Sequence, residues 1–556
     1  MTSATNAVAD PTYPAGSGAR SAPSANQSSR WRWALSGLLS GGFGLAVAEL
    51  FVGATNRFTS PILSVGDKAI DLVPVPLKNF AIRTFGTHDK QALLFGIFSA
   101  IAVFALVVGL AGRRRLPLAV AGFAIFGAVG AAAAVTGRTG KASDAVPSIL
   151  AVVVAIATFL VLARVLARKL RGIPGAGPIR ESLKSPKSPE SPTSPAEQGG
   201  SGSRRQFLVL AGGVAVATGG IGSFGRWLQN SAGAIAKRVA VVLPNAKKPL
   251  SGLPKTVGVS ELTTATPFFT PNKSFYRIDT ALVVPKVDVD SWTLKMKGMV
   301  GVNRTYTYED LLARDLVERD ITLTCVSNEV GGILMGTARW LGVPLRELLE
   351  ESEMDPKATQ IVGRSVDGWT SGFPVSAVTD GRDTLVAVAM NGEPLPFEHG
   401  FPARLIVPGL YGYVSATKWL KEIEATTMEA FDAYWVPRGY AKQAPIKLAS
   451  RIDVPRGLST VPAGRTAIAG VAWAQRHGIS KVEVSIDNGP WKPADLADEV
   501  SLDTWRQWRF AWDAPTGRHD VAVRAYDGKG RLQAEKRVAP LPNGATGWHS
   551  IIVLVS

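Results

Sequence analysis

The apolar runs of this chain lie almost entirely in its first 225 residues, whereas the rest of the 556-residue sequence has the pattern of a soluble protein. A helix needs about 20 mainly apolar residues to cross the hydrocarbon core of a bilayer. Five stretches approach that length, and they are residues 33–54, 92–112, 116–136, 147–167 and 206–224. The sequence therefore predicts an N-terminal region of five transmembrane helices, followed by a soluble region long enough for more than one domain.

Basic residues cluster at the ends of these stretches and predict their orientation. Arg30 and Arg32 precede the first stretch, Arg113–Arg115 separate the second from the third, and further lysines and arginines lie between the fourth and fifth. Loops rich in Lys and Arg stay in the cytoplasm, so we expect a multi-pass protein of the cell membrane whose chain after about residue 225 is extracytoplasmic. This placement explains the net charge of +17 better than nucleic-acid binding, for which the sequence has no motif.

Glu49 is an unusual residue for a membrane span, because a charged side chain is costly in lipid. It must either face a protein partner or lie near the membrane interface, and we favour the interface.

A Ser/Pro/Gly tract, "SLKSPKSPESPTSPAEQGGSGS", separates the fourth stretch from the fifth and cannot bury a core. It leads into "SRRQFLVLAGGVAVATGG", which resembles a twin-arginine export signal in an internal position; the alternative is an ordinary basic flank of a cytoplasmic loop. We predict a disordered N-terminus at 1–30, a four-span transmembrane region at 31–170, a disordered linker at 171–203 and a twin-arginine-like fifth span at 204–226.

The soluble region changes its pattern near residue 435. From 250 to 435, short strand-like runs alternate with two helical patterns, "YTYEDLLARDL" and "VPLRELLEES", and this predicts an α+β domain. From 436 to 556, alternating strands separated by turns such as "DNGP" and "DGKG" predict an immunoglobulin-like β-sandwich. Its tryptophans are expected in its core or at an interface, and they are Trp473, Trp491, Trp505, Trp508 and Trp512.

Cys325, in "ITLTCVSNEVGG", is the only cysteine of the chain. It is either a small buried hydrophobic residue or a reactive or ligating sulfur. The five histidines accompany no G-x-S-x-G elbow and form no cluster suited to zinc, and the sequence lacks both C-x-x-C-H and a G-x-G-x-x-G after a strand. These absences leave a metal or cofactor site with a single protein thiolate.

Several motifs, in order along the chain, resemble the sulfite oxidase family of molybdopterin enzymes. They are "TPNKSFYRIDTAL", "ITLTCVSNEVGG…GTARWLGVPLRELL" and "AVAMNGEPLPFEHGFPARLIVPGLYGYVSATKWLKEI", and the resemblance continues through the β-sandwich. The resemblance implies a molybdenum–molybdopterin cofactor, with Cys325 as the metal ligand and a catalytic residue. A soft thiolate is a suitable ligand for such a metal, and the phosphate of the pterin requires cations and backbone donors.

The same resemblance implies a set of residues around the pterin. Arg404 and Lys418 are expected to bind the cofactor, and His399 to contact it; the alternatives are ordinary ion pairs and a turn-capping imidazole. The remaining expected cofactor-binding residues are Asn272, Arg277, Ile278, Asp279, Ser365, Asp367, Ser415 and Thr417. We predict Tyr434 as the active-site tyrosine of the family, with Tyr440 as a second candidate and structural packing as the alternative for both.

The sequence departs from the family after the cysteine, where Asn328 is kept but Glu329 and Val330 replace two arginines. A dianion such as sulfite requires positive potential at the metal, so a small oxyanion and an S- or N-oxide are both candidate substrates. We therefore predict an oxygen-atom-transferring oxidoreductase that needs a separate cytochrome or quinone system as its electron partner. The alternatives are an S-oxide or N-oxide reductase of the same fold and a cofactor-less membrane scaffold or sensor.

Overall fold

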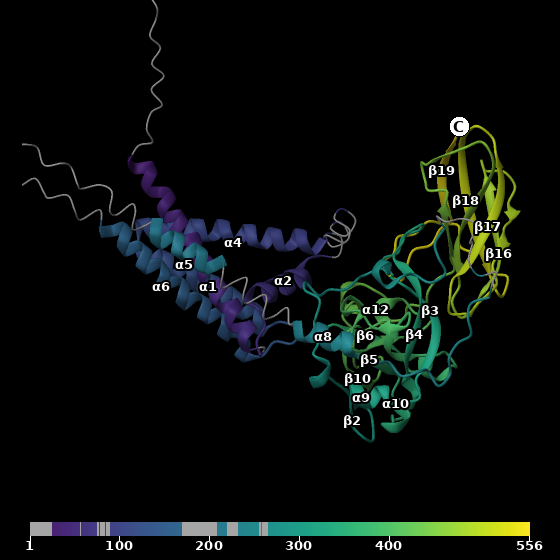
Figure 1. Ribbon diagram of the computed structural model, residues 1–556, viewed down its shortest axis with the longest axis horizontal. Helices are drawn as coiled ribbons and strands as arrows, with labels where there is room; N and C mark the ends of the chain where they lie inside the picture. The colour runs from purple at the N-terminus through teal and green to yellow at the C-terminus, as the bar shows by residue number, and fades with distance from the viewer. Residues whose placement is uncertain are drawn as a thin grey trace, which may run out of the picture. The chain divides into compact units, whose positions relative to one another are not determined.

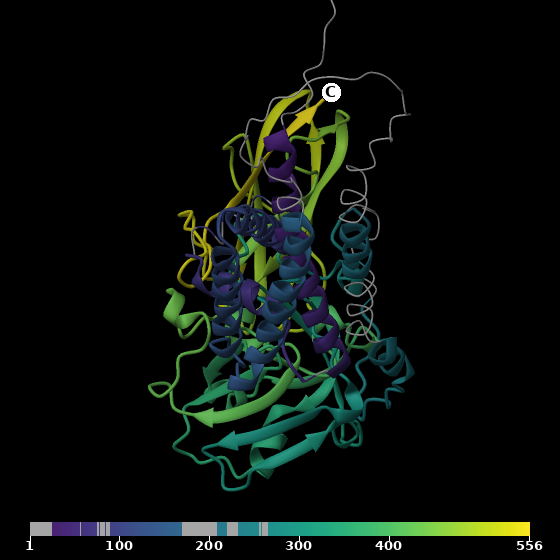
Figure 2. The same ribbon diagram turned by 90° about the vertical axis from the view of Figure 1, so that its left-hand side faces the viewer.

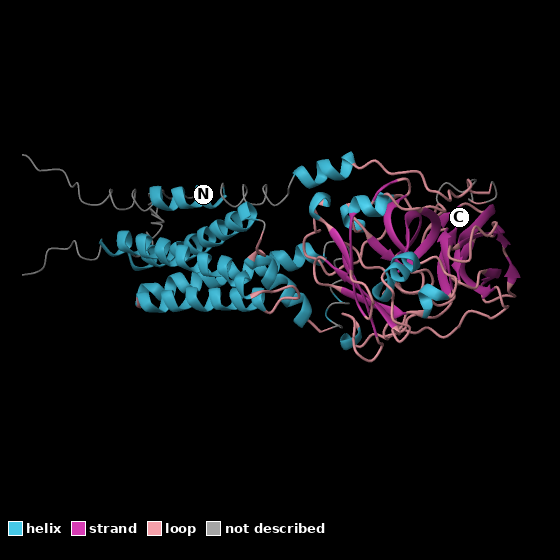
Figure 3. Ribbon diagram, turned by 90° about the horizontal axis from the view of Figure 1, so that it is seen from below, coloured by secondary structure: helices cyan, strands magenta, loops and turns pink. Residues whose placement is uncertain are grey.

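The computed structural model describes residues 25–55, 57–74, 77, 80, 84, 89–168, 208–219, 232–254, 257 and 265–556. The predicted linker, Arg204 and Arg205 lie outside the described residues, as does most of the predicted disordered N-terminus. The chain divides into two compact units, the first made of Met1–Pro61, Phe95–Ala132 and Asp144–Arg226, and the second made of Ile62–Leu94, Ala133–Ser143 and Trp227–Ser556. The first unit is helical, whereas the second contains the strands (Figure 3).

Four helical segments near the N-terminus are long and apolar enough to cross a membrane, and they are Arg30–Thr55, Lys90–Arg114, Leu116–Val135 and Ala142–Leu166. They belong to helices α1 (Ala25–Thr55), α4 (Asp89–Arg114), α5 (Leu116–Val135) and α6 (Val146–Arg168) (Figure 1). The first four predicted spans thus match helices. The fifth prediction is corrected to a shorter apolar helix, Leu208–Gly219, so the described residues contain four candidate spans and not five.

Glycines bring the helices of the first unit close together. A Cβ atom added to Gly37 of α1 would lie 2.1 Å from the carbonyl oxygen of Ala105 in α4. One added to Gly44 would lie 2.3 Å from that of Ala151 in α6. Such close approach of backbones through small residues is typical of helices that pack within membranes.

Glu49 of α1 is paired with another residue of the same chain. Its side chain is buried, and the hydroxyl of Ser60 donates a 2.5 Å hydrogen bond to its carboxylate. A neighbouring donor reduces the cost of placing this group in an apolar region, so the partner interpretation describes its contacts better than the interfacial one.

Two sheets form the central part of the second unit (Figure 1). One has the order β2 (Arg304–Thr307), β1 (Thr293–Gly298), β10 (Leu420–Thr426), β5 (Gln360–Ser365) and β6 (Thr370–Pro374); β1 and β10 are parallel, and the other pairs are antiparallel. The other is antiparallel, with β3 (Val317–Thr324), β4 (Met335–Pro344), β7 (Leu385–Met390) and β8 (Glu393–Pro394), and with β9 (Arg404–Ile406) beside β7. All six residues of β7, "LVAVAM", are buried, as expected for a central strand covered on both faces.

Short helices connect these strands. The two predicted helices are confirmed as α9 (Tyr308–Leu312) and α10 (Leu345–Glu351). Thr307 caps α9 in a reciprocal arrangement with Asp310, which satisfies backbone donors of its first turn. The other helices of this unit are α2 (Pro61–Leu72), α8 (Ala232–Ala240), α11 (Ser376–Thr379) and α12 (Gly412–Ser415).

Two further sheets make up the C-terminal region (Figures 1 and 2). The first contains β11 (Ala449–Val454), β13 (Gly464–Trp473), β17 (Arg506–Ala514) and β16 (Asp495–Leu496). The second contains β12 (Thr460–Val461), β19 (His549–Val555), β18 (Gly517–Asp527), β14 (Ile479–Ile486) and β15 (Lys492–Pro493). Side chains from both sheets, including Ile468, Val521 and Val553, share one apolar core.

The five tryptophans predicted for this region have different environments. Trp508 and Trp512 lie in its core, whereas Trp473 and Trp505 belong to the hydrophobic core of the central domain. The indole of Trp505 donates a 3.1 Å hydrogen bond to the carbonyl of Phe268. Trp491 is half-buried, and its ring packs against that of Trp548 with the centroids 5.0 Å apart.

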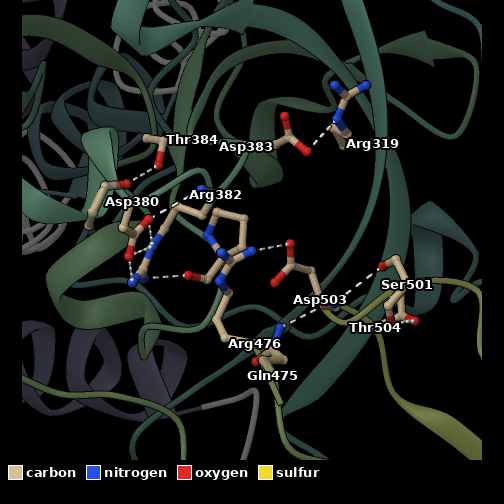
Figure 4. A network of polar contacts seen from close by, with 12 residues as sticks. Arg319, Asp380, Arg382, Asp383, Thr384, Gln475, Arg476, Ser501, Asp503 and Thr504 are labelled. Atoms are coloured by element: carbon tan, nitrogen blue, oxygen red, sulfur yellow. Dashed lines mark hydrogen bonds and ion pairs between the residues drawn. The ribbon is translucent and has the colours of Figure 1, made fainter. Parts of the chain in front are cut away.

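A polar network also joins the central domain to the C-terminal region (Figure 4). The side-chain amide of Gln475 donates to the carbonyls of Thr322 (2.5 Å) and Asp503 (2.9 Å), and Ser501 donates to the carbonyl of Asp320. Burial raises the pKa of Asp503, and Arg476, 3.4 Å away, acts in the opposite direction. These bonds and the shared tryptophans hold the two regions together.

Candidate functional site

Cys325 lies directly after β3, in the connection to β4, and is buried. Its backbone N–H donates to the carbonyl of Leu334 (3.0 Å), and the side chain of Asn328 accepts from the N–H of Leu334 (2.8 Å). The backbone N–H of Ser327 points to the Cys325 sulfur at 3.4 Å. Burial raises the pKa of this thiol while the Ser327 donors lower it. A thiolate here would therefore need further stabilisation, such as a bond to a metal.

Three tyrosine hydroxyls lie within electrostatic range of this thiol. Tyr276, Tyr411 and Tyr440 each lie close enough for the charge of Cys325 to act on their hydroxyls. Burial is the larger cause in each case, and it raises the pKa of Tyr411 to about 12. Tyr276 is also within electrostatic range of Arg404, the predicted cofactor-binding cation.

Arg404, the first residue of β9, is a buried cation without a carboxylate partner among the described residues. Its Nη1 donates to the carbonyl of His399 (3.1 Å), and its guanidinium lies 5.2 Å from the ring centroid of Trp340. Its Nε has no hydrogen-bond partner within the described part of the chain. Burial lowers the pKa of Arg404 to about 10. Buried charges in proteins are normally paired, so this environment suits a bound anion.

Lys418 provides a second buried cation. Its ammonium donates to Asp279 (2.6 Å) and to the carbonyl of Glu398 (3.1 Å). Burial lowers its pKa to about 8, although Asp279 acts to raise it. Burial would raise the pKa of Asp279, but Lys418, Lys90 and Arg277 outweigh it and hold that pKa well below its usual range.

His399 lies at the same place, with its Nε2 3.0 Å from the carbonyl oxygen of Asn272. Burial, followed by the charge of Arg404, lowers the pKa of His399 to about 4, so the imidazole is neutral at pH 7. The side chain of Asn272 bonds to Met390, Glu393 and Asn391.

The other predicted cofactor-binding residues have contacts of their own. Ile278 is 38% exposed. The hydroxyl of Ser415 donates to the carbonyls of Leu410 and Tyr411, and that of Thr417 bonds to Ser371 (2.6 Å). Ser365 and Asp367 flank the β5–β6 turn, where Asp367 accepts from the N–H of Trp369 (3.1 Å).

The two candidate tyrosines lie in different environments. The hydroxyl of Tyr434 donates to Asp71 (2.6 Å) and accepts from Arg138 (3.1 Å). Tyr440 is the one beside Ser327 and Cys325.

Residues near Cys325 also come from segments that sequence reasoning did not connect to it. Tyr276 falls within the motif "TPNKSFYRIDTAL", but nothing in the motif indicates that its hydroxyl lies within electrostatic range of the thiol. The guanidinium of Arg451 donates to the carbonyl of Gly332 (2.8 Å), and a Cβ added to Gly331 would lie 2.3 Å from Nε2 of His549. The C-terminal region thus contacts the turn that follows Cys325, a contact between distant residues that no sequence pattern signals.

These residues fit a molybdenum–molybdopterin group. Cys325 offers one soft ligand, and Arg404 and Lys418 offer buried positive charge for a phosphate, with an Arg404 donor left without a partner among the described residues. In the part of the chain that the structure describes, no group of three or more His, Cys, Asp or Glu side chains is arranged to hold a metal ion.

Comparison with known proteins agrees with this fit. Residues 281–435 match the family described as "Oxidoreductase molybdopterin binding domain". The chain is 28% identical over 342 residues to mitochondrial sulfite oxidase of Homo sapiens, covering 52% of this chain and 62% of that enzyme, which is less than two thirds of its length. It is 32% identical over 157 residues to the uncharacterized oxidoreductase YuiH of Bacillus subtilis, covering 28% of this chain and 74% of that protein.

Among solved structures, the sulfane dehydrogenase SoxCD from Paracoccus pantotrophus matches with a TM-score of 0.46 and 22% identity, covering 52% of this chain and 81% of that chain. The mitochondrial sulfite oxidases are among the relatives of this chain. The family match and the YuiH match show that the chain belongs to the sulfite oxidase family of molybdopterin-binding oxidoreductases, whose cofactor is molybdenum–molybdopterin.

Proposed function

We propose that this protein is a membrane-anchored oxidoreductase that transfers an oxygen atom to or from a small substrate on the extracytoplasmic side of the membrane. The observation that carries the proposal is the buried thiol of Cys325 together with the buried Arg404, whose Nε has no hydrogen-bond partner among the described residues. When bound, the cofactor supplies a metal that exchanges an oxygen atom while changing its oxidation state by two electrons.

The residues of this chain would have separate roles. Cys325 would ligate the metal, and Arg404 and Lys418 would bind the phosphate of the pterin. His399 would contact the pterin as a neutral imidazole. The other expected contacts come from Asn272, Arg277, Ile278, Asp279, Ser365, Asp367, Ser415 and Thr417. Of the two candidate tyrosines, the contacts favour Tyr440 over Tyr434 as the one that faces the substrate.

Metal and pterin analysis tests this function directly. We expect about one molybdenum and one pterin per wild-type chain and a loss of molybdenum in Cys325→Ser. Ser352→Ala is the control, because it changes a buried hydroxyl that donates to the carbonyl of Leu348 and leaves Cys325 and Ser327 untouched. A wild-type protein purified from molybdenum-replete cells without either component would instead support the membrane scaffold or sensor.

The direction of the reaction and the substrate require an activity test. Glu329 is exposed and Val330 is half-buried, and neither carries the positive charge that sulfite would favour. Assays with sulfite and ferricyanide, and then with methionine sulfoxide and reduced viologen, separate a sulfite-type oxidase from an S-oxide reductase. A cytochrome or a membrane quinone system would exchange electrons with the site, because the sequence carries no haem, flavin or iron–sulfur motif.

The basic residues beside the apolar helices support the proposed orientation. Arg30 and Arg32 begin the first candidate span, and Arg113 and Arg114 end α4. The internal twin-arginine motif would deliver a folded, cofactor-loaded domain to the outer side. Protease treatment of intact spheroplasts tests this: the region after residue 232 should be cleaved without lysis. Protection of that region would place it in the cytoplasm.

We further propose that the C-terminal region has the immunoglobulin-like topology of the family and mediates dimers. Its two sheets and shared apolar core support the first part. The mass of the detergent-solubilised protein, measured by light scattering, tests the second.

A further inference from the structure

We propose that Arg138, in the turn between α5 and α6, is a positioning residue that holds three segments of the cofactor pocket in one geometry. The three segments are 277–280, the β5–β6 turn at 365–369, and 434–438. Arg138 lies outside the family match at 281–435, in the part of the chain that precedes the oxidoreductase domain. It nevertheless belongs to the same compact unit as that domain. The inference rests on the proposed function, since the first two segments bear residues expected to surround the pterin and the third bears Tyr434.

The first contact reaches the segment that carries Asp279. Nη1 of Arg138 donates a 2.8 Å hydrogen bond to the hydroxyl of Thr280, which is buried. The neighbouring Asp279 accepts from Lys418 at 2.6 Å. Arg138 thus fixes the backbone next to the carboxylate that orients a cofactor-binding lysine.

The second contact is a close approach of backbones. Gly368 has a φ of +81°, and a Cβ atom there would lie 2.6 Å from Cβ of Arg138 and 3.0 Å from Cγ2 of Thr139. Only glycine fits this conformation and this space without strain. The turn that contains Gly368 also carries Asp367 and follows Ser365, so the Arg138 turn packs on the segment that bears two more of the predicted pocket residues.

The third contact fixes Tyr434. Its ring lies between two guanidinium groups, with Cζ of Arg138 4.6 Å and Cζ of Arg438 3.7 Å from the ring centroid. Nη2 of Arg138 donates to the Tyr434 hydroxyl at 3.1 Å. Stacking of a planar guanidinium on an aromatic face is favourable, and it uses a geometry that lysine cannot reproduce.

Asp71 of α2 holds Arg138 in place for all three contacts. Its carboxylate accepts from Nη2 (2.6 Å) and Nε (3.2 Å) of the guanidinium, and it also accepts from the Tyr434 hydroxyl. Burial would lower the pKa of Arg138, but the hydrogen bond that it donates to Asp71 and the charges of Tyr434, Asp71 and Asp367 together outweigh burial. One paired arginine therefore contacts three chain segments at once, through hydrogen bonds to Thr280 and Tyr434 and through its Cβ against Gly368. Groups that orient ligand-holding residues in this way typically contribute about 10–100-fold to metal affinity or activity.

The experiment compares full-length variants for retention of the pterin. Arg138→Ala should release the cofactor about tenfold faster than wild type, measured as the fluorescence of oxidised pterin freed during dilution. Arg138→Lys keeps the charge but not the planar fork, so its release rate should fall between those of wild type and Arg138→Ala. Lys68→Ala is the matched control: Lys68 also lies on α2 and donates to the carbonyl of Thr136, but it has no hydrogen bond or ion pair with a pocket segment among the described residues.

A second measurement distinguishes positioning from general stability. Hydrogen–deuterium exchange of Arg138→Ala should increase in the segments 277–280, 365–369 and 434–438, while exchange of the C-terminal strands stays at the wild-type level. Equal release rates in wild type and Arg138→Ala would overturn the proposal, as would an increase in exchange spread evenly over the whole domain. If Arg138→Ala does not fold, the release rate of Arg138→Lys decides in the same way. A wild-type protein without pterin would instead count against the proposed function.

Discussion

The hydroxyl of Tyr434 donates a 2.6 Å hydrogen bond to Asp71, a residue 363 positions earlier in the sequence. Tyr440, only six residues further along, lies instead beside Ser327 and Cys325. Two tyrosines of one short motif therefore have different partners, and their contributions to stability and to turnover can be measured separately.

Removing the two hydroxyls should affect different properties, namely kcat for Tyr440 and the free energy of unfolding for Tyr434. Tyr440→Phe removes a hydroxyl near the thiol and should lower kcat about 100-fold, the low end of what a positioned proton donor contributes. Tyr434→Phe should leave kcat nearly unchanged and lower the free energy of unfolding by about 1 kcal/mol, because Asp71 keeps its arginine partners. Steady-state kinetics and thermal unfolding in detergent check both. Equal losses of kcat in the two variants would contradict this assignment.

Arg404→Met should affect the cofactor and the fold in opposite directions. It removes a buried cation that is expected to hold a phosphate, so the pterin content should fall. In protein from cells that cannot make molybdopterin, the same change removes an unpaired buried charge and should raise the free energy of unfolding by about 1–3 kcal/mol.

Arg364→Met is the control for this effect, because Arg364 is paired with Glu424 at 2.5 Å and with Glu422 at 3.1 Å. It should give no gain in stability in the cofactor-free protein. If Arg404→Met lowered that stability instead, the guanidinium would be better satisfied than its contacts indicate.

Cofactor binding should weaken above about pH 8. Burial lowers the pKa of Lys418 from 10.5 to about 8, so in the cofactor-free protein its ammonium loses its proton as the pH rises through that value. An anionic phosphate favours the protonated form, so binding above pH 8 must take up a proton, and the apparent Kd should rise about tenfold per pH unit. Titration of cofactor-free protein with pterin at about pH 7 and pH 9 measures this. Lys418→Arg should show a flatter dependence, since arginine keeps its charge.

Asp67→Asn should stabilise the protein at neutral pH but not in acid. Burial raises the pKa of Asp67 from 3.8 to about 6, while Arg138 acts in the opposite direction. Below pH 3.8 the carboxyl is protonated in both the folded and the unfolded chain. Between pH 3.8 and about 6 the unfolded chain releases this proton while the folded chain keeps it, so the free energy of unfolding falls. Above about pH 6 both have released it, and this contribution to stability is lost.

At one pKa unit per 1.4 kcal/mol, Asp67→Asn should gain about 3 kcal/mol of unfolding free energy at pH 7.5 relative to wild type. The gain should vanish near pH 4. Thermal unfolding at the two pH values provides the measurement, and a gain that is the same at both would show that the carboxyl is not the cause.

Much of the site could be predicted because its residues occur in short motifs. Cys325, His399, Arg404 and Lys418 each lie in a run whose order along the chain is typical of the family, and the structure brings the last three together. The two helices of the central domain were also predictable, since "YEDLL" and "LRELLEE" combine apolar periodicity with a capping residue or a preceding proline.

Contacts between distant segments could not be predicted in this way. The pairing of Asp71 with Arg138 and of both with Tyr434 depends on how separate elements pack, and a single sequence carries no periodicity or spacing that reports it. The prediction of Tyr434 ahead of Tyr440 was made without knowledge of these contacts, for the same reason.

Trp505 fills the core of the central domain although it follows the last residue of the family match, Trp435, by 70 positions. Its backbone N–H binds Thr322, and its indole binds the carbonyl of Phe268. The ribosome must therefore synthesise most of the C-terminal strands before the catalytic half can complete its interior. Nascent chains that stop short of Trp505 would leave an opening in that interior, so the maturation of the enzyme has to wait until translation is nearly finished.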